Sequence, residues 1–179
     1  MDHAEWRERV ILVDKNDREI GTEEKLAAHR DGALHRALSV FVLDDAGRLL
    51  LQRRSLGKYH SGGLWSNSCC GHPRPGESTE AAAHRRLREE MGFDCELRPI
   101  LSFVYHAALG GELCEHELDH VFLGCFRGQP DSNAYEVSEW RWITVPNLTE
   151  ELSREPWRFS VWLPIALGEL LSRGLLADS

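Results

Sequence analysis

Two pairs of side chains in this chain of 179 residues are suited to proton transfer or metal binding. Glu115 and Glu117 stand two positions apart, so on a β-strand both side chains would point to the same face. Carboxylates placed in this way repel each other unless a cation lies between them or one of them holds a proton. Cys69 and Cys70 are adjacent. Spacing alone favours a buried apolar role for both thiols, which is the usual place of an intracellular cysteine.

The stretch from Gly71 to Phe93 combines a glycine-containing loop with a predicted helix that carries carboxylates. Such a loop and helix can hold a hard divalent cation against a diphosphate. Arg86 and Glu90 are four positions apart, so their side chains would share one face of the helix. They could form an intrahelical salt bridge worth roughly 0.3–0.5 kcal/mol. Alternatively, Arg86 could contact phosphate oxygens while Glu90 binds a Mg²⁺ that bridges them.

The same stretch resembles the Nudix box, G-x5-E-x7-R-E-U-x-E-E-x-G-U, in which U is an apolar residue. The matching positions are Gly71, Glu77, Arg85, Leu87, Glu89, Glu90, Gly92 and Phe93. Arg86 departs from the box, because it replaces the glutamate of the R-E-U triplet. Diphosphate cleavage commonly needs several carboxylates to hold metal and water, so this change argues against a hydrolase. An arginine there would instead favour binding of the diphosphate.

Segments around the box resemble type I isopentenyl-diphosphate isomerases, and they follow in that family's order between about Val10 and Trp162. These segments are 25–29 (KLAAH), 34–37 (LHRA), 53–58 (RRSLGK), 67–73 (NSCCGHP), 115–117 (EHE) and 156–162 (PWRFSVW). The resemblance implies an enzyme that moves the double bond of isopentenyl diphosphate to give dimethylallyl diphosphate. The implied route protonates the alkene and removes a different proton from the opposite face, through a state with tertiary carbocation character. Such chemistry needs a strong proton donor, an opposing base and exclusion of water.

The resemblance also implies a metal centre of three imidazoles and two carboxylates. The implied ligands are His29, His35, His72, Glu115 and Glu117. A mixed nitrogen and oxygen set suits Mn²⁺ or Mg²⁺, and Zn²⁺ is a further option. Any one of these histidines alone would more commonly be a core residue. The match of five positions together favours the metal site.

The proton-transfer residues are implied in the same way. Cys70, and not Cys69, matches the family's catalytic cysteine, and Glu117 matches its carboxylate partner. Tyr105 matches an aromatic residue that assists the glutamate by hydrogen bonding, although a strand residue on the core face is an equally good interpretation. Trp162 matches a ring that stabilises the developing positive charge, by about 1–2 kcal/mol. We expect protonation from the side of Glu117 and Tyr105 and deprotonation by Cys70, although the sequence leaves the order open.

Diphosphate binding is expected from cationic side chains that match the family's phosphate contacts. These are Lys25, Arg54, Lys58 and Arg86. Glu90 and the main-chain carbonyl of Cys70 are the implied ligands of a Mg²⁺ on the diphosphate. No role is assigned to Arg36, Arg53, His60, His84, His106, His116 or His120.

Two other functions use the same motif. A Nudix diphosphohydrolase acting on a nucleotide or another diphosphate would share the box, but Arg86, the Glu115 and Glu117 pair and the histidine set argue against it. A catalytically silent module that binds metal or diphosphate is the other. It is disfavoured because every proton-transfer position is present.

A small set of predicted elements must position these residues. Apolar and alternating runs predict strands over 10–13, 37–43, 48–52, 97–106, 118–126 and 139–143, with a hairpin turn at 44–47. One helix is predicted over about Thr79–Met91, with Ser78 as its N-cap and Gly92 as its stop, and another over about 159–173. The element order and the resemblance predict an α+β fold with Nudix-like α/β/α layers, a mixed β-sheet flanked by helices. We expect one domain over 1–179, with an N-terminal extension over about 1–9.

The composition and net charge of the chain limit the kinds of partner that it is expected to bind. Apolar residues make up 42% and charged residues 28% of the chain, as in a globular protein, and the net charge is −8. This charge argues against a main role in coating nucleic acid or an anionic membrane, and no apolar run approaches a membrane span. The N-terminus lacks the apolar stretch of a signal peptide, and five cysteines without C-x-x-C spacing favour free thiols. We expect a cytoplasmic monomer or weak dimer whose partner is a small-molecule diphosphate.

Overall fold

The computed structural model describes residues 8–176, so the extension predicted over about 1–9 lies almost wholly outside the described residues. Within this range a helix lies in the middle and helices close the chain, as predicted, although a short helix also separates the second and third strands and three strands follow the middle helix. No helix in the described range has the length and apolarity that crossing a bilayer requires.

β3 (His35–Leu43) is the central strand of the sheet. It pairs in parallel with β8 (Leu113–Cys125) and antiparallel with β6 (Cys69–Gly71). It also pairs antiparallel with β1 (Arg9–Val13) and β4 (Leu49–Arg54). Because parallel and antiparallel pairs meet on one strand, the sheet is mixed, as predicted.

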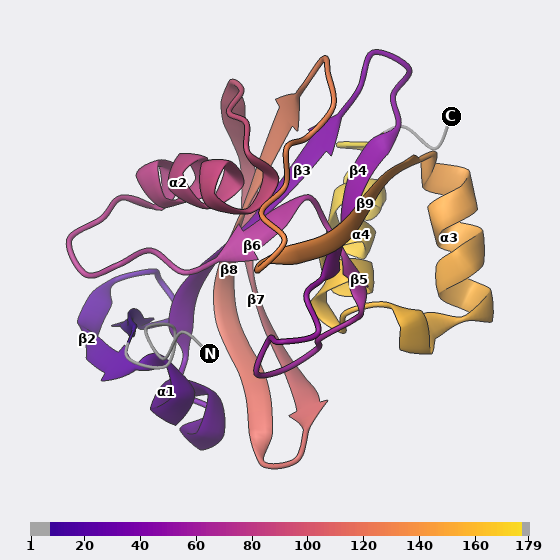
Figure 1. The fold of residues 1–179 in the computed structure, drawn as a ribbon. Coiled ribbons are helices and arrows are strands. Elements are labelled where there is room, and N and C mark those ends of the chain that lie inside the picture. The colour runs from indigo at the N-terminus through magenta and orange to yellow at the C-terminus, as the bar shows by residue number, and fades with distance from the viewer. Residues whose placement is uncertain (1–7, 177–179) are drawn as a thin grey trace.

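The other strands extend this sheet through their neighbours. β7 (Leu97–Gly110) pairs antiparallel with β8, and the two form a long hairpin that reaches beyond the rest of the sheet (Figure 1). β9 (Val137–Ile143) and the short β5 (Trp65–Ser66) pair with β4, and β2 (Glu19–Glu24) pairs with β1. The long hairpin therefore carries side chains from the core out to the pocket described below.

Helices cover both faces of the sheet. Alternate side chains of β3 point to opposite faces, and each face has its own apolar core. Val40 packs on the face covered by α2 (Thr79–Met91), whereas Phe41 packs with α3 (Val145–Arg154) and α4 (Trp162–Ser172). Figure 1 shows α2 on one side of the sheet and α3 and α4 on the other. The predicted α/β/α layering is confirmed.

α2 has the bounds and the caps that the sequence predicts. The Ser78 hydroxyl accepts a hydrogen bond from the Ala81 N–H at 3.2 Å, and Gly92 ends the helix at a φ of 73°, in the left-handed region. Leu87 and Met91 are fully buried in the core beneath the helix. The turn at 44–47 is also confirmed, since the Gly47 N–H donates to the Asp44 carbonyl.

Several elements differ from the predicted ones. α4 begins at Trp162, because Pro156–Arg158 forms a separate 3-10 turn and Phe159 is extended. β8 begins at Leu113 rather than near Leu118, since pairing with β7 continues through its polar first half. The patterns did not predict α3, the short strands β2, β5 and β6, or α1, a helix of seven residues that spans Lys25–Asp31.

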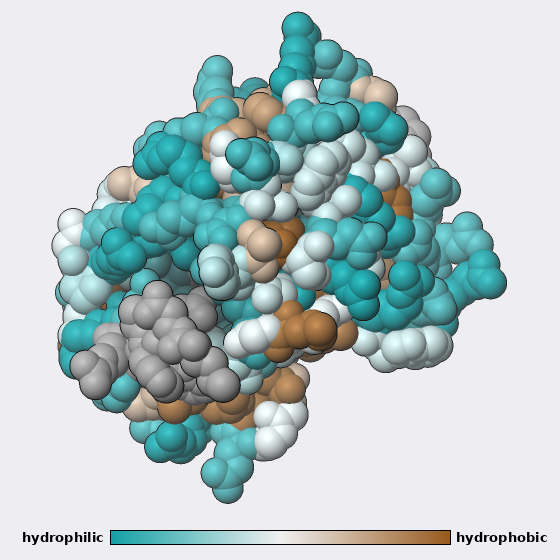
Figure 2. Space-filling model, viewed as in Figure 1, coloured by the Kyte–Doolittle hydropathy of each residue, from teal (hydrophilic) through white to brown (hydrophobic). Residues whose placement is uncertain are grey.

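The surface viewed in Figure 2 is mostly hydrophilic, with small and separate hydrophobic patches. Leu56, Tyr135 and Trp157 are among the exposed large apolar side chains. Such scattered residues are ordinary for a protein surface.

Candidate active site

One pocket brings together residues that lie far apart in the sequence. It is bordered by the sheet, α2, the start of α4 and the loop 55–64 between β4 and β5. The sequence-predicted site residues that line it are Lys25, Arg54, Lys58, Cys70, His72, Arg86, Glu90, Tyr105, Glu115, Glu117 and Trp162. His29 and His35 are fully buried and contact this lining through the two carboxylates.

Strand register places the polar side chains on one face of the sheet. His35 on β3 lies opposite Glu117 on β8, and Glu117 lies opposite Tyr105 on β7. Residues opposite each other in a ladder share a face, and Glu115 shares it because it precedes Glu117 by two positions. This is the face on which Phe41, farther along β3, packs under α4.

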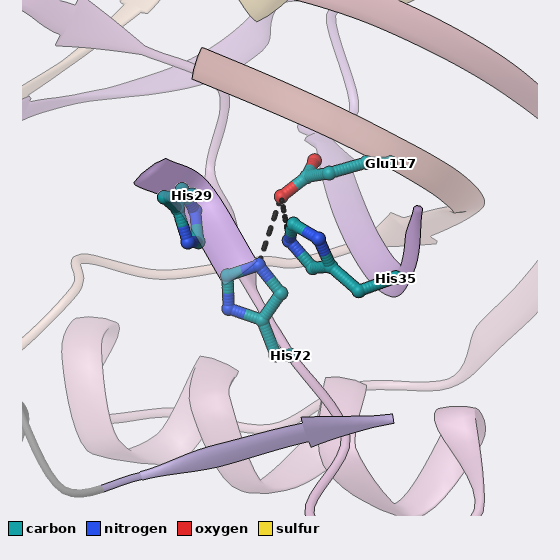
Figure 3. A group of neighbouring side chains, drawn as sticks. All are labelled: His29, His35, His72 and Glu117. Carbon is teal, nitrogen blue, oxygen red and sulfur yellow. Dashed lines mark hydrogen bonds and ion pairs between the residues drawn. The ribbon is translucent and has the colours of Figure 1, made fainter. Parts of the chain in front are cut away.

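Three imidazoles from different elements, those of His29, His35 and His72, converge beside Glu117, as Figure 3 shows. The Nε2 atom of His72, just after β6, is 2.8 Å from Glu117 Oε1, and His35 Nε2 is 3.5 Å from the same oxygen. His29, from α1, has its Nε2 atom 3.1 Å from Glu115 Oε2. The ligand atoms of His29, His35, His72 and Glu117 all lie within 4.8 Å of one another. This spacing is compatible with a single metal ion.

The tautomers of two imidazoles support that interpretation. The Nδ1 atoms of His29 and His35 lie 2.7 and 2.8 Å from the main-chain carbonyls of Lys25 and Ala33, so Nδ1 carries the proton in the neutral ring. Their Nε2 lone pairs therefore face the carboxylates. Neither Nε2 atom has a hydrogen-bond partner, nor does Glu115 Oε2, and all three are buried. A divalent cation would satisfy these atoms together, so the residues fit a metal.

The two carboxyl groups differ in their protonation. Burial, and then the neighbouring charge of Glu117, raise the pKa of Glu115 well above its ordinary value. Burial would also raise the pKa of Glu117, but contacts with His35 and His72 outweigh it and hold that pKa well below the ordinary value. Tyr105 donates a hydrogen bond of 2.6 Å to Glu117 Oε2. Without a metal, Glu115 therefore holds a proton more readily than Glu117, and the Tyr105 phenol contacts Glu117.

β6 sends the two adjacent sulfurs to opposite faces of the sheet. Cys69 pairs with Val40 and is fully buried in the apolar core beneath α2. Cys70 pairs with Ser39 and lines the pocket. The alternation of a strand thus distinguishes two thiols that the sequence distinguishes only by resemblance.

The Cys70 thiol lies in an apolar part of the pocket, next to Tyr105 and Trp162. Burial raises the pKa of Cys70 to about 12, although the charge of Arg54 acts against this rise. Arg54 Nη1 is 3.9 Å from the sulfur. Cys70 is therefore a neutral thiol at rest, with a cation beside it that would favour the thiolate.

Trp162 presents its ring to the same pocket. Its indole N–H donates to Ser66 Oγ at 2.9 Å and to Asn67 Oδ1 at 3.2 Å, which fixes the plane of the ring. The guanidinium carbon of Arg54 lies 5.1 Å from the ring centre. Arg54 and the Trp162 ring therefore make a cation–π contact in the pocket lining.

A cluster of charges occupies the α2 end of the pocket. Arg86 pairs with Glu90 and donates to Glu136 Oε2 at 3.0 Å, and Lys58 pairs with Glu136 as well. Glu90 also accepts a hydrogen bond from Gln52 Nε2 at 2.5 Å. The intrahelical salt bridge that the spacing allows is present, and it lies in the pocket lining rather than on a solvated face.

Two other residues of the Nudix-box pattern shape the loop that presents His72. Arg85 donates to the two carboxylate oxygens of Glu77 at 2.7 and 2.8 Å, and to the main-chain carbonyl of His72 at 3.3 Å. Glu77 also accepts from the Arg74 N–H at 2.9 Å. This bidentate pair holds the loop between β6 and α2 in place.

Sequence reasoning missed three acidic or imidazole side chains in or next to the pocket. Glu136 lies in the loop before β9, and no local pattern marks it. Asp119 is buried two positions after Glu117, its Oδ2 atom accepts a bond of 2.8 Å from Ser39, and burial raises its pKa to about 8. The alternating E-x-E-x-D pattern could have revealed it. His60 lines the pocket two residues after Lys58, where a K-x-H pattern was the available signal.

Comparisons with known proteins agree with this geometry. The NUDIX domain family matches residues 33–163. An isopentenyl-diphosphate delta-isomerase of Burkholderia multivorans is 58% identical over 87% of this chain and 88% of its own. One of Aromatoleum aromaticum is 53% identical over 92% of this chain and 87% of its own, and one of Serratia proteamaculans is 52% identical over 91% of each.

The fold itself recurs in solved structures. A Deinococcus radiodurans protein of known crystal structure superposes with a TM-score of 0.76 at 23% identity, over 90% of this chain and 98% of its own. At this identity the likeness concerns the fold alone. Together, the family match and the relatives show that the chain belongs to the Nudix superfamily and, within it, to the isopentenyl-diphosphate delta-isomerase family.

Proposed function

We infer that this chain is an isomerase that converts isopentenyl diphosphate into dimethylallyl diphosphate, a step of isoprenoid biosynthesis. Relatives that carry the isomerase name are 52–58% identical to it. One structural observation supports the mechanism above all others. A thiol and a carboxyl group, those of Cys70 and Glu117, line one pocket together with an aromatic ring, that of Trp162.

The reaction moves one double bond and exchanges two protons. A proton adds to the terminal carbon of the alkene, and positive charge develops on the tertiary carbon. A second proton then leaves the neighbouring CH₂ group, and its electron pair forms the new double bond. Protonation of an unactivated alkene requires a donor and a base on opposite sides of the substrate in a site that excludes water.

We propose that a protonated Glu117 donates the first proton and that the Cys70 thiolate accepts the second. The reactive state would form when one proton moves from the Cys70 thiol to the Glu117 carboxylate, and the two transfers would leave Glu117 ionised and Cys70 protonated. Tyr105 would support the donor, because its hydroxyl is already bonded to Glu117 Oε2 and can compensate the carboxylate that forms. Arg54 would support the acceptor, since its charge beside the sulfur opposes the effect of burial on the pKa of Cys70. The Trp162 ring would lower the energy of the cationic state between the two transfers.

We propose that a divalent metal is held by the histidine and glutamate set. Its ligands would be His29, His35, His72, Glu115 and Glu117. The mixed donors favour Mn²⁺ or Mg²⁺, with Zn²⁺ as the third candidate. When bound, the metal supplies positive charge that stabilises the carboxylates and increases the acidity of a protonated Glu117.

The diphosphate would be held at the α2 end of the pocket. Its contacts would be Lys25, Arg54, Lys58 and Arg86, while Glu90 and the carbonyl of Cys70 would bind a Mg²⁺ on the phosphate oxygens. Arg86 takes the place of a carboxylate that hydrolases use for metal and water. The diphosphate would therefore be an anchor for the hydrocarbon and would remain intact.

Incubation with isopentenyl diphosphate in D₂O, followed by ¹H and ³¹P NMR, tests the function. With Mg²⁺ and Mn²⁺ present, we expect the allylic isomer and deuterium in the methyl group formed from the terminal alkene carbon. Release of inorganic phosphate instead would identify a diphosphohydrolase. A substrate that binds and stays unchanged in the metal-loaded protein would leave only a binding module, and the isomerase would be rejected.

A further inference from the structure

We propose that His60 is an additional ligand of the metal centre, contributed by the loop that also carries the diphosphate-binding Lys58. The inference rests on the proposed function, because it adds a residue to the same pocket. It assigns a chemical role to a side chain that the sequence patterns left without one.

The position of His60 supports a ligand role. It lies in the loop 55–64, its side chain is 10% exposed, and its Nε2 atom is 3.9 Å from Glu115 Oε1. The ligand atoms of His29, His60 and Glu115 lie within 4.8 Å of one another, the same limit that holds around Glu117. His29 belongs to both groups. His60 therefore extends the metal centre on the side of Glu115.

The loop orients the ring so that Nε2 faces the centre. His60 Nδ1 is 3.2 Å from the Ser61 hydroxyl, and the His60 carbonyl accepts a hydrogen bond from Arg54 at 3.3 Å. Ser61 has a φ of 52°, in the left-handed region that a non-glycine residue seldom adopts. His29 and His35 follow the same design, with Nδ1 engaged and Nε2 directed at a carboxylate.

Atoms that could bind a metal lie next to His60 without hydrogen-bond partners. His29 Nε2 and Glu115 Oε2 are buried without a hydrogen-bond partner. A cation that satisfies His29 Nε2 and Glu115 Oε2 would lie beside His60 Nε2 as well, because the ligand atoms of the three residues lie within 4.8 Å of one another. Mg²⁺ commonly takes six ligands, so a further donor such as His60 could join the five predicted residues.

A ligand in this loop would link the metal to diphosphate binding. Lys58 precedes His60 by two residues and pairs with Glu136, which in turn accepts a hydrogen bond from Arg86. An ion bound to His60 would restrain one part of the loop while Lys58 lies at the diphosphate end. Metal occupancy and order of the loop should therefore be coupled, and coupling of this kind is reciprocal.

Packing is the competing explanation for His60. Its ring lies edge-on to Trp162, with centroids 5.8 Å apart, and edge-on to Tyr59 at 4.3 Å. His60→Phe keeps an aromatic ring and removes the nitrogen, so it separates the two roles. His60→Gln serves as a second variant if the phenylalanine protein does not fold, and His106→Phe is a matched control at an exposed position on β7.

Cobalt titration of the full chain, after removal of metal with a chelator, tests the ligand. We expect His60→Phe and His60→Gln to weaken Co²⁺ binding by about 10–100-fold and to change the visible absorption of the bound ion, while His106→Phe matches the wild type. Unchanged affinity and spectrum in both His60 variants would make the residue part of the pocket wall and overturn the proposal.

Hydrogen exchange tests the coupling. Co²⁺ should slow exchange of the loop 55–64 in the wild type and leave it fast in His60→Phe. Equal slowing in both proteins would show that the loop is ordered without this ligand. Failure of the isomerase proposal would be seen separately, as metal-loaded wild type that forms no allylic product, and would leave the cobalt result intact.

Discussion

The two ends of the pocket differ in how their buried polar groups are balanced. At α2, Arg86 and Lys58 pair with Glu90 and Glu136, so cations and carboxylates neutralise one another. At the other end, imidazoles face carboxylates, and buried atoms such as His29 Nε2 have no hydrogen-bond partner. Ion pairs satisfy the first cluster from within the chain, whereas the second would be satisfied by the proposed cation. The first end should therefore form without metal, and the second should depend on it.

Glu117 lies at the end of the pocket where the metal is proposed, and we expect its replacement to cause the largest loss of turnover. Glu117→Gln keeps the shape of the side chain but removes a metal ligand and the proposed proton donor. Turnover should fall by about 10⁴-fold, the upper range for loss of an acid/base group. NMR rates on metal-saturated protein, together with metal content, measure this. Glu112→Gln, at an exposed position near the start of β8, is the control. A loss below tenfold in Glu117→Gln would separate the metal centre from the reaction.

The two adjacent cysteines provide the next comparison. Cys70→Ala should lower the turnover number by about 10²–10⁴-fold, because it removes the proposed base from the pocket. Cys69→Ala should keep activity within a few-fold and lower the free energy of unfolding instead, since Cys69 packs beneath α2. Steady-state rates and urea unfolding of both variants check this. Equal losses of activity at matched stability would mean that the wrong sulfur has been chosen.

A substitution of Arg86 tests the α2 end of the pocket, where cations and carboxylates of the chain pair with one another. Arg86→Gln should raise KM about 30–100-fold with a smaller change in kcat, because a hydrogen bond from a charged donor contributes about 2–3 kcal/mol to binding. Arg88→Gln, on the same helix but paired with Asp94 on the exposed side, is the control. An unchanged KM would remove Arg86 from the diphosphate site and leave it as a salt-bridge partner of Glu90.

Local signals account for the parts of the fold that the sequence predicted well. α2 has a capping serine, a terminal glycine and an apolar stripe within one short stretch, so its bounds follow from neighbouring residues. β6 has no such signal. It is held by pairing with β3, and the Ser68 hydroxyl next to it bonds the distant Val42 and Leu50. Its short length and nonlocal contacts explain why patterns missed it.

The site divides in the same way. Residues within dense motifs, such as Cys70, Glu117 and Arg86, could be named by resemblance, although roles for them remain proposals. Glu136 meets Arg86 only because the loop before β9 folds back over α2, so no spacing could reveal it. Asp119 could have been predicted from the sequence, because it follows Glu117 by two positions on a strand and therefore points to the same face.

In metal-free protein, acid should destabilise the end of the pocket that contains His72. Burial lowers the pKa of His72 to about 3, whereas the unfolded chain has the ordinary value of about 6.5. Between these values the unfolded chain binds a proton that the folded chain excludes. The free energy of unfolding should therefore decrease as the pH is lowered below about 6.5, and it should recover when the pH is raised back to that value.

The expected slope from His72 alone is at most about 1.4 kcal/mol per pH unit over that window. Urea unfolding in chelator between pH 5 and 7.5 measures it, and His72→Gln should have a shallower slope than the wild type. His106→Gln, at an exposed position, should keep the wild-type slope. Equal slopes for wild type and His72→Gln would mean that the folded protein accepts the proton. The protonated His72 imidazole would then be paired with a carboxylate of the chain, as Arg86 is. His72 would in that case not depend on a metal, and the proposed difference between the two ends would not hold for this residue.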